Sequence, residues 1–547
     1  MDNMNQDNMN PNMKATPHGA APTPQAATYA ANGAAQAGTY AGNGATKAAR
    51  YSVVPSPQAL TWEERYQPKE DIETLNFREK MASKLGLASL IYALFSTFCI
   101  YDNWAGITMP LFAIGSLIYM VYGLKQYDIK IKKYGWFYGA VIIALALSNF
   151  LTGNLALHFF NCTGIILLIF TFLLHNVYDD SRWNFSKTTF AIIESFFCSI
   201  GALSDYTKDM KVLKKRKAEH TVEKNHTFKY ILIGLLISIP LVAVLLTLLS
   251  QADMIFGDLL KTYFRFKFDF DNAFGIAITF AVLYFGSYCV LRFFSKKTIN
   301  EEVIEKRNME PVIAITVLSI VSVIYLLFSV IQIVYLFWGG VKLPEKYTYA
   351  EYAREGFFQL LAVSIINFLM VLFVNKHFRE NVVLKVLMTI ISICTYIMIA
   401  SSCMRMLLYI DAYLLTFLRV LVLWGLAVLS LFFIAVIISI YKNDFPLFKY
   451  CVVVVSILYL FLSFSHPDHV IADYNLSNIA GKDAKANISC DYDYLTNLST
   501  DAAPVIAQYD GEWVREYFLN NSEFYRNRSI RQFNLSYYTA KVLSETK

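Results

Sequence analysis

The sequence predicts an all-α fold, a polytopic transmembrane helix bundle with about eleven spans. Three observations support this prediction. Hydrophobic residues make up 56% of the 547 residues and charged residues only 16%, whereas soluble proteins carry roughly a quarter charged residues. Long apolar stretches recur along the chain, whose mean hydropathy is +0.40. Lys and Arg gather in alternate connections between these stretches, as expected when lipid is the main solvent.

The N-terminal segment, residues 1–78, is expected to be a disordered cytoplasmic tail. It is rich in Ala, Gly, Asn, Pro and Thr, and such a composition cannot bury enough apolar area to offset the entropy of ordering. It holds no apolar core of a signal peptide, so the first span is expected to act as the insertion signal.

Each predicted span is a mostly apolar run near the length of about 20 residues that crosses a bilayer. The first membrane part, residues 79–229, holds spans at 85–101, 105–123, 135–151 and 154–175. The second part, residues 230–465, holds spans at 230–250, 273–294, 311–338, 356–374, 386–404, 414–441 and 450–464.

Residues 185–203 are also apolar, but we interpret them as an interfacial amphipathic helix rather than a twelfth span. They contain Lys187 and Glu194. As a span, they would put two strongly basic loops on opposite sides of the membrane. The nearby run KKRK at 214–217 is expected to mark a cytoplasmic loop, with contact to anionic lipid headgroups as the alternative.

The orientation follows from the Lys and Arg residues near the span ends. With eleven spans these residues fall on one face: Arg78, Lys80, Lys84, Lys125, Lys130, Lys132, Lys133, the run 208–217, Lys296, Lys297, Lys376, Arg379, Lys442 and Lys449. We expect that face to be cytoplasmic, in a bacterial cytoplasmic membrane. The C-terminus is then extracytoplasmic.

The C-terminal segment, residues 466–547, is expected to form a small helical region outside the membrane. Residues 491–509 predict one amphipathic helix, with Tyr494, Leu495 and Leu498 on one stripe. The sequence HPDH at 466–469 could contribute metal ligands with Asp468 or Asp473. Pro467 and the loop context favour a solvated turn instead.

Polar residues that would be costly in lipid gather near the predicted outer face, and they form our candidate site. The set is Asp253, Gln332, Tyr352, Arg354, Arg405, Tyr409, Asp411, Tyr413 and Arg419. Arg419 is the most informative, because it lies in an apolar span and requires a partner. We expect Asp411 and Asp253 to be its partners. The set is either a site for an anion or headgroup, or a group of ion pairs that join helix ends.

No catalytic, metal or cofactor site is predicted. The sequence lacks nucleotide-binding, zinc-protease, hydrolase and kinase motifs, and its eight cysteines show no metal-ligand spacing. The net charge of +6 is explained by the loops, so no nucleic-acid partner is expected. The expected partners are the lipid bilayer and its anionic headgroups, while protein partners stay open.

Four segments carry a resemblance to a known family. They are SQADMIF, KYTYAEYAREGFFQL, RMLLYIDAYLLTFLRVLVLW, and the pair HVIADYNLSN with DYDYLTNLSTDAAPVI. Together they resemble bacterial polytopic membrane proteins of the domain-of-unknown-function four-one-seven-three family, over about residues 230–510. In the family motif YGLTxLR a glycine stands where this chain has Leu414. The resemblance adds weight to Tyr352, Arg354, Arg405, Tyr409, Asp411, Tyr413 and Arg419, and it implies no activity.

Two functions are compatible with these observations. The first is transport or binding of a small molecule, ion or lipid through the polar site on the outer side. The second is membrane signalling or envelope assembly through protein partners. An enzyme is not expected, because the carboxylates Asp253 and Asp411 lack a paired nucleophile, base or metal.

Overall fold

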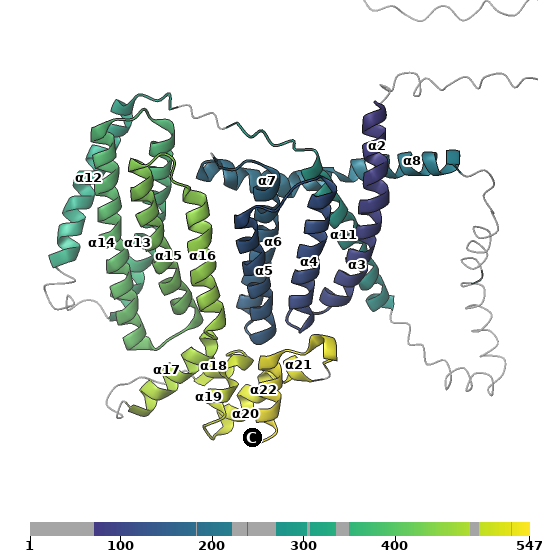
Figure 1. The fold of residues 1–547 in the computed structure, drawn as a ribbon. Coiled ribbons are helices and arrows are strands. Elements are labelled where there is room, and N and C mark those ends of the chain that lie inside the picture. Colours follow the sequence, from purple (N-terminus) through teal and green to yellow (C-terminus); the bar gives the residue numbers. More distant parts are fainter. Residues whose placement is uncertain are drawn as a thin grey trace, which may run out of the picture. The chain divides into compact units, whose positions relative to one another are not determined.

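The computed structural model describes residues 71–181, 183–220, 238, 270–302, 307–334, 349–481, 492–526 and 528–547. Within these residues, ten helical segments are long and apolar enough to cross a membrane (Figure 1). The first runs from α2 (Ile72–Lys80) through the π-helical turn η1 (Met81–Leu85) into α3 (Gly86–Ile100). The others are α4 (Thr108–Gln126), α5 (Lys133–Leu151), α6 (Leu155–Val177), α11 (Phe270–Ser295), α12 (Pro311–Gln332), α13 (Tyr349–His377), α14 (Val382–Tyr413), α15 (Phe417–Tyr441) and α16 (Leu447–Phe464).

These ten segments correspond to ten of the eleven predicted spans, and the all-α polytopic fold is confirmed. The remaining predicted span, 230–250, lies outside the described residues. Helix α2 begins at Ile72, inside the predicted tail of residues 1–78. Its anchor is Arg78, whose Nη1 atom donates to Asp209 Oδ1 of α8 at 2.8 Å.

The spans pack as two bundles. Helices α3 to α6 and α11 share one apolar core, and helices α12 to α15 share another. Helix α16 contacts both α15 and α5 and so lies between the bundles. The bundles therefore divide after α11, so the first bundle includes a span that the sequence assigns to the second membrane part, residues 230–465.

Two helices that are not among the ten candidate spans follow α6. Helix α7 (Phe185–Gly201) runs across the span ends in Figure 1 and contacts α6, α11 and α16. Its exposed side chains include Phe190, Phe197 and Ile200, as expected of the predicted interfacial helix. Helix α8 (Leu203–His220) is tied to α2 through the Asp209 pair and through Arg216 and Glu79 at 2.6 Å.

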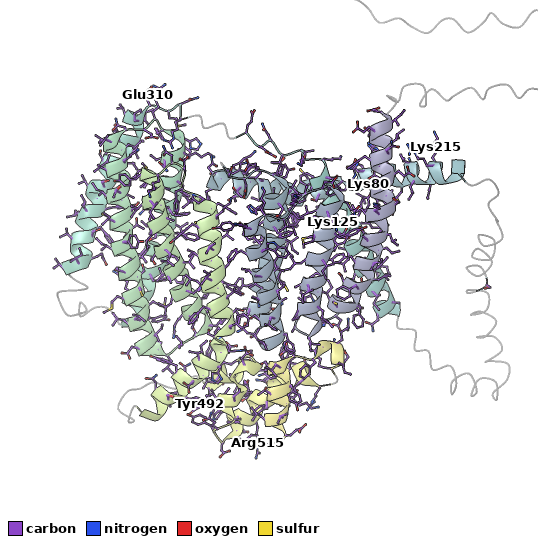
Figure 2. All side chains as sticks on the ribbon, in the orientation of Figure 1. Lys80, Lys125, Lys215, Glu310, Tyr492 and Arg515 are labelled. Carbon is purple, nitrogen blue, oxygen red and sulfur yellow. The ribbon has the colours of Figure 1, made fainter. Side chains whose placement is uncertain are left out.

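The span ends define two faces. Lys80, Lys125 and Lys215 lie at one, which we call the basic face, and Tyr492 and Arg515 lie at the other, which we call the C-terminal face (Figure 2). Helix α8 is at the basic face, whereas α11 begins at the C-terminal face, where Tyr101 donates to Asn272 at 3.1 Å.

The C-terminal face is covered by short helices, as predicted for residues 466–547. They are α17 (Pro467–Gly481), α18 (Tyr492–Thr496), η3 (Thr500–Ala502), α19 (Ala503–Ile506), α20 (Glu512–Asn520), α21 (Ser522–Tyr525), η4 (Ile530–Gln532) and α22 (Leu535–Ser544). The prediction of one helix over 491–509 is wrong. The side chain of Ser499 caps η3, and Pro504 lies in the first turn of α19, so the segment is broken into three pieces.

Candidate functional site

Two of the predicted site residues meet inside the second bundle. Arg405 Nη2 lies 3.4 Å from Gln332 Oε1, which also accepts a hydrogen bond from Ser401 Oγ at 2.6 Å. Gln332 ends α12, and Arg405 lies about two turns before the end of α14. Both side chains are buried near the C-terminal face. The structure thus brings the Arg405 guanidinium and the Gln332 amide together near the ends of their spans, as the sequence predicts.

Arg419 follows the turn that joins α14 to α15, and it folds back over the end of α14. Its guanidinium donates to the carbonyl of Tyr413 at 2.7 Å and to that of Leu414. It also stacks on the ring of Tyr409 at 4.2 Å. Asp411 is not among its described partners. The guanidinium instead satisfies open carbonyls at a helix C-terminus, where a cation is favoured.

Leu414 gives this turn its shape. Its φ of 64° and ψ of −177° fall in a region that is populated almost only by glycine. A leucine in this conformation carries backbone strain. Its buried side chain, 8% exposed, offsets that strain.

The other predicted residues are less informative. Tyr413 is half exposed, and Asp411 is exposed at the end of α14. Tyr352 and Arg354 lie in the first turns of α13, with their side chains outside the description. Asp253 lies outside the described residues.

A chain of hydrogen bonds between polar side chains inside the second bundle was not predicted from the sequence. Tyr325 Oη donates to Asn367 Oδ1 at 2.8 Å, and Asn367 Nδ2 donates to Thr395 Oγ1 at 2.9 Å. Asn367 and Thr395 are fully buried. Hydrogen bonds of this kind join neighbouring spans in lipid. Single uncharged residues in apolar spans carry no signal by which they could have been found.

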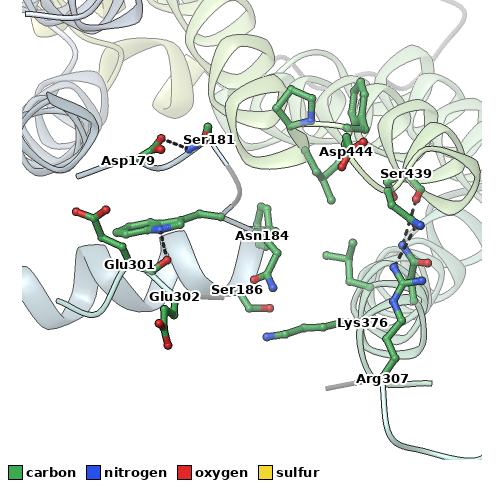
Figure 3. Close-up of a pocket in the computed structure, with 18 residues that line it drawn as sticks. Asp179, Ser181, Asn184, Ser186, Glu301, Glu302, Arg307, Lys376, Ser439 and Asp444 are labelled. Carbon is green, nitrogen blue, oxygen red and sulfur yellow. Dashed lines mark hydrogen bonds between the residues drawn. The ribbon is translucent and has the colours of Figure 1, made fainter. Parts of the chain in front are cut away.

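A cleft of about 1030 Å³ opens on the basic face, between the two bundles (Figure 3). Its first-bundle wall includes Trp183, Glu301 and Glu302, and its second-bundle wall includes Lys376 and Asn443. Apolar residues of a small cluster that joins the bundles also line it, namely Phe185, Leu372, Phe445 and Leu447.

The two walls of the cleft differ in charge. Glu301 and Glu302 belong to the first-bundle wall, where Trp183 Nε1 donates to the Glu301 carbonyl at 3.2 Å. On the opposite wall, Arg307 is engaged by Glu380 and donates to Asn443 at 3.1 Å. Among the described residues, Lys376 forms no ion pair. The cleft is therefore lined by the carboxylates of Asp179, Glu301, Glu302 and Asp444 and by the amine of Lys376.

At the opposite end, the C-terminal helices hold the first bundle by its α5–α6 connection. Asp501 Oδ1 accepts a hydrogen bond from the Gly153 amide at 2.8 Å, and its other oxygen accepts from the Thr152 hydroxyl. Asp468 Oδ2 accepts from Asn154 Nδ2 at 2.9 Å. These carboxylates are 6% and 3% exposed, and they satisfy polar groups that the helix ends leave open.

Asn534 makes a further attachment to the first bundle. Its Nδ2 atom donates to the carbonyls of Ala105, Asn149 and Thr152 at 2.9, 3.0 and 2.9 Å. Its Oδ1 caps α22 by accepting from the Tyr537 amide at 3.1 Å. One side chain thus connects the last helix to two connections between spans.

The second bundle is held at the α14–α15 connection. Asn475 pairs with both backbone groups of Leu415, at 2.8 and 2.9 Å. The Tyr494 hydroxyl accepts from the Phe417 amide at 2.9 Å. We call the residues that make these attachments the clamp: Asp468, Asn475, Tyr494, Asp501 and Asn534.

The clamp residue Asp501 also contacts a histidine side chain, that of His466. His466 Nδ1 lies 3.3 Å from Asp501 Oδ2, and this contact raises the pKa of His466 against the effect of burial. Burial opposes the charge on Asp501, but hydrogen bonds led by that of His466 hold its pKa below the ordinary value. Burial raises the pKa of Asp468.

The prediction of a solvated turn at HPDH is therefore wrong. Asp468 is buried because its partners, Asn154 and the Ser499 amide at 3.1 Å, come from distant parts of the sequence. Within the described residues, no group of three or more His, Cys, Asp or Glu side chains could hold a metal ion.

The family described as Domain of unknown function (DUF4153) matches residues 139–509, which is more than half of the chain. The chain belongs to this family. The resemblance to an uncharacterised family is thus confirmed, but the family is DUF4153 and not four-one-seven-three. The match contains the cleft and every clamp residue except Asn534. No curated protein and no solved structure matches the chain.

Proposed function

We propose that this protein transports a small polar solute across a bacterial cytoplasmic membrane, with the cleft as its entrance. One observation carries the proposal. The clamp joins the two bundles by buried hydrogen bonds at one face, whereas at the other face a polar cleft opens between them beside a small apolar cluster. Two bundles held in this way can rock about the clamped end, and rocking of one bundle against another is a common basis of alternating access.

The polar groups of the molecule support this assignment. A solute with both charges would find Glu301 and Glu302 on the first-bundle wall of the cleft, and Lys376 together with Asp444 on the second-bundle wall. Beyond the cleft, the line of Tyr325, Asn367 and Thr395 and the pair of Gln332 and Arg405 provide hydrogen-bonding groups within the second bundle. In our proposal the basic face is cytoplasmic, so the cleft opens to the cytoplasm.

Signalling or envelope assembly is the second candidate, and the clamp itself favours it. Because the C-terminal helices contact both bundles, a partner bound to them would sense any movement between the bundles. Cross-linking in intact cells would then capture a partner protein in stoichiometric amounts. Recovery of the protein alone under several growth conditions would count against this candidate.

A ligand screen on the purified protein tests the transport proposal. Wild-type protein, Lys376→Gln and the control Lys125→Gln are placed in nanodiscs and heated with pools of amino acids, nucleotides and sugar phosphates. We expect a compound that raises the unfolding temperature of the wild type and the control but not of Lys376→Gln. Lys125 is an exposed lysine of the basic face that does not line the cleft. Equal stabilisation of all three proteins would reject the cleft as the binding site.

A further inference from the structure

The C-terminal region contains a second hollow, of about 450 Å³, formed by α20, α21, α22 and the residues that follow α21 and α22. Arg515 of α20, Arg526 after α21 and Lys541 of α22 line it. We propose that this hollow binds a soluble ligand that carries phosphate groups. The site is independent of the cleft, and its lining residues all follow residue 509, where the family match ends.

Charge is the first argument. The lining also includes Lys547 and one acidic residue, Glu545. Lys547 donates to Asp510 at 2.6 Å. Within the described part of the chain, no ion pair engages Arg515, Arg526 or Lys541. All three cations are exposed, and together they create a positive potential at the hollow that attracts an anion, most strongly at low salt. Two of them are arginines, whose planar donors match the oxygens of a phosphate.

The shape of the hollow is the second argument. Phe518 is buried, Leu519 is 65% exposed, and the Tyr525 hydroxyl donates to the Phe518 carbonyl at 2.7 Å. This hydrogen bond fixes the tyrosine ring at the edge of the cation cluster. An apolar or sugar portion of a ligand could contact these residues while its phosphates meet the cations. The volume falls within the range of small-molecule sites, roughly 300 to 1000 Å³.

Location indicates the source of the ligand. Arg515 lies at the end of the C-terminal helices that is farther from the spans (Figure 2). A phosphate in solution can reach this end, whereas the headgroups of the surrounding membrane lie near the span ends. The same helices reach the clamp, because Tyr517 of α20 donates to the Ser499 carbonyl at 2.6 Å and Asn534 caps α22.

Pyrophosphate is a suitable probe. The full chain is placed in nanodiscs of phosphatidylcholine, and binding is measured by calorimetry at constant ionic strength. The double variant Arg515→Gln/Lys541→Gln is compared with Lys211→Gln/Lys214→Gln, which removes the same charge from exposed lysines of α8. We expect the first variant to bind at least tenfold more weakly than the wild type, since two charge-assisted hydrogen bonds are lost. The control should bind like the wild type.

A second comparison keeps the test decisive if the double variant is poorly folded. Arg526→Gln should also weaken binding, and Arg526→Lys should retain most of it because the charge remains. Equal binding by all variants, or no binding by the wild type, would overturn the proposal. Loss of pyrophosphate binding by the wild type when phosphatidylglycerol replaces phosphatidylcholine would assign the site to lipid headgroups and reject a soluble ligand.

Discussion

The two ends of the helix bundles are built in different ways. At the C-terminal face, buried side chains from the C-terminal helices satisfy the backbone of the α5–α6 and α14–α15 connections. At the basic face, the same two bundles are separated by a cleft lined with charged residues. Removing a partner from a buried hydrogen bond costs far more than changing an exposed charge. The comparison therefore indicates a fixed end and a movable end.

The largest effect is expected from Asp501→Ala. The change leaves the Thr152 hydroxyl, the Gly153 amide and His466 without their shared partner in a buried site. Loss of one member of a buried charged network costs about 3 to 5 kcal/mol. Protease susceptibility of the C-terminal region, measured against urea concentration in nanodiscs, reports this loss.

Two control variants, each lacking an exposed carboxylate, show whether the loss of stability in Asp501→Ala depends on burial. Asp510→Ala removes an exposed ion pair with Lys547, and Glu302→Ala removes a carboxylate of the cleft. Both variants should unfold close to the wild type, because exposed charges contribute little to stability. If Glu302→Ala were as damaging as Asp501→Ala, the contrast between the two ends would be wrong.

Gly153→Ala tests how closely the clamp fits the first bundle. An added Cβ would lie 2.0 Å from Thr500 Oγ1, so the α5–α6 connection and η3 would have to separate. Such overpacking costs about 1 to 3 kcal/mol. Gly201→Ala, with nothing within 4 Å of the added atom, serves as the control in the same urea titration. A Gly153→Ala protein as stable as the control would contradict the tight fit.

Substitutions of Leu414 test the backbone shape of the α14–α15 connection, where the clamp holds the second bundle. Leu414→Ala removes a buried side chain and keeps the strain at φ 64°, whereas Leu414→Gly removes both. Glycine should therefore be the more stable of the two by about 1 to 2 kcal/mol. This order reverses the usual preference for alanine over glycine in ordered structure. The two unfolding midpoints provide the measurement, and the usual order would argue against the backbone shape of this turn.

The smallest effect is a dependence on pH. Because Asp501 raises the pKa of His466, this pair contributes stability that is complete below 6.5, the ordinary histidine value, and is lost as the pH rises through the folded pKa. The effect is weakened by solvent, since the His466 side chain is 37% exposed. His466→Gln should flatten the decline in stability above pH 6.5. An unchanged decline would assign it to another group.

The sequence predicted the spans and the common face of the basic residues because both depend on local composition. A bilayer sets the length of an apolar run, and Lys125 or Lys376 can be assigned to a face by counting spans. Of the two expected partners of Arg419, Asp253 lies outside the described residues. The other, Asp411, would lie about 12 Å from Arg419 along an unbroken helix. The helix in fact ends at Tyr413, and the chain turns at Leu414.

The clamp and the cleft could not be predicted in this way. Asp501 contacts Thr152 across 349 positions of sequence, and its segment has the composition of an ordinary surface helix. The cleft is lined by residues from several separate connections, and none of these forms a motif. Such features depend on how the bundles pack, which hydropathy and residue spacing do not encode.

The most direct test of the account compares movement at the two ends. In a cysteine-free background, spin labels are attached at positions 186 and 443 across the cleft, and at positions 155 and 418 beside the clamp. Double electron–electron resonance then measures both distances in nanodiscs. We predict a broad or two-peaked distribution across the cleft and a single narrow one beside the clamp. Equally narrow distributions at both ends, unchanged by any stabilising ligand, would contradict a bundle pair that rocks about its clamped end.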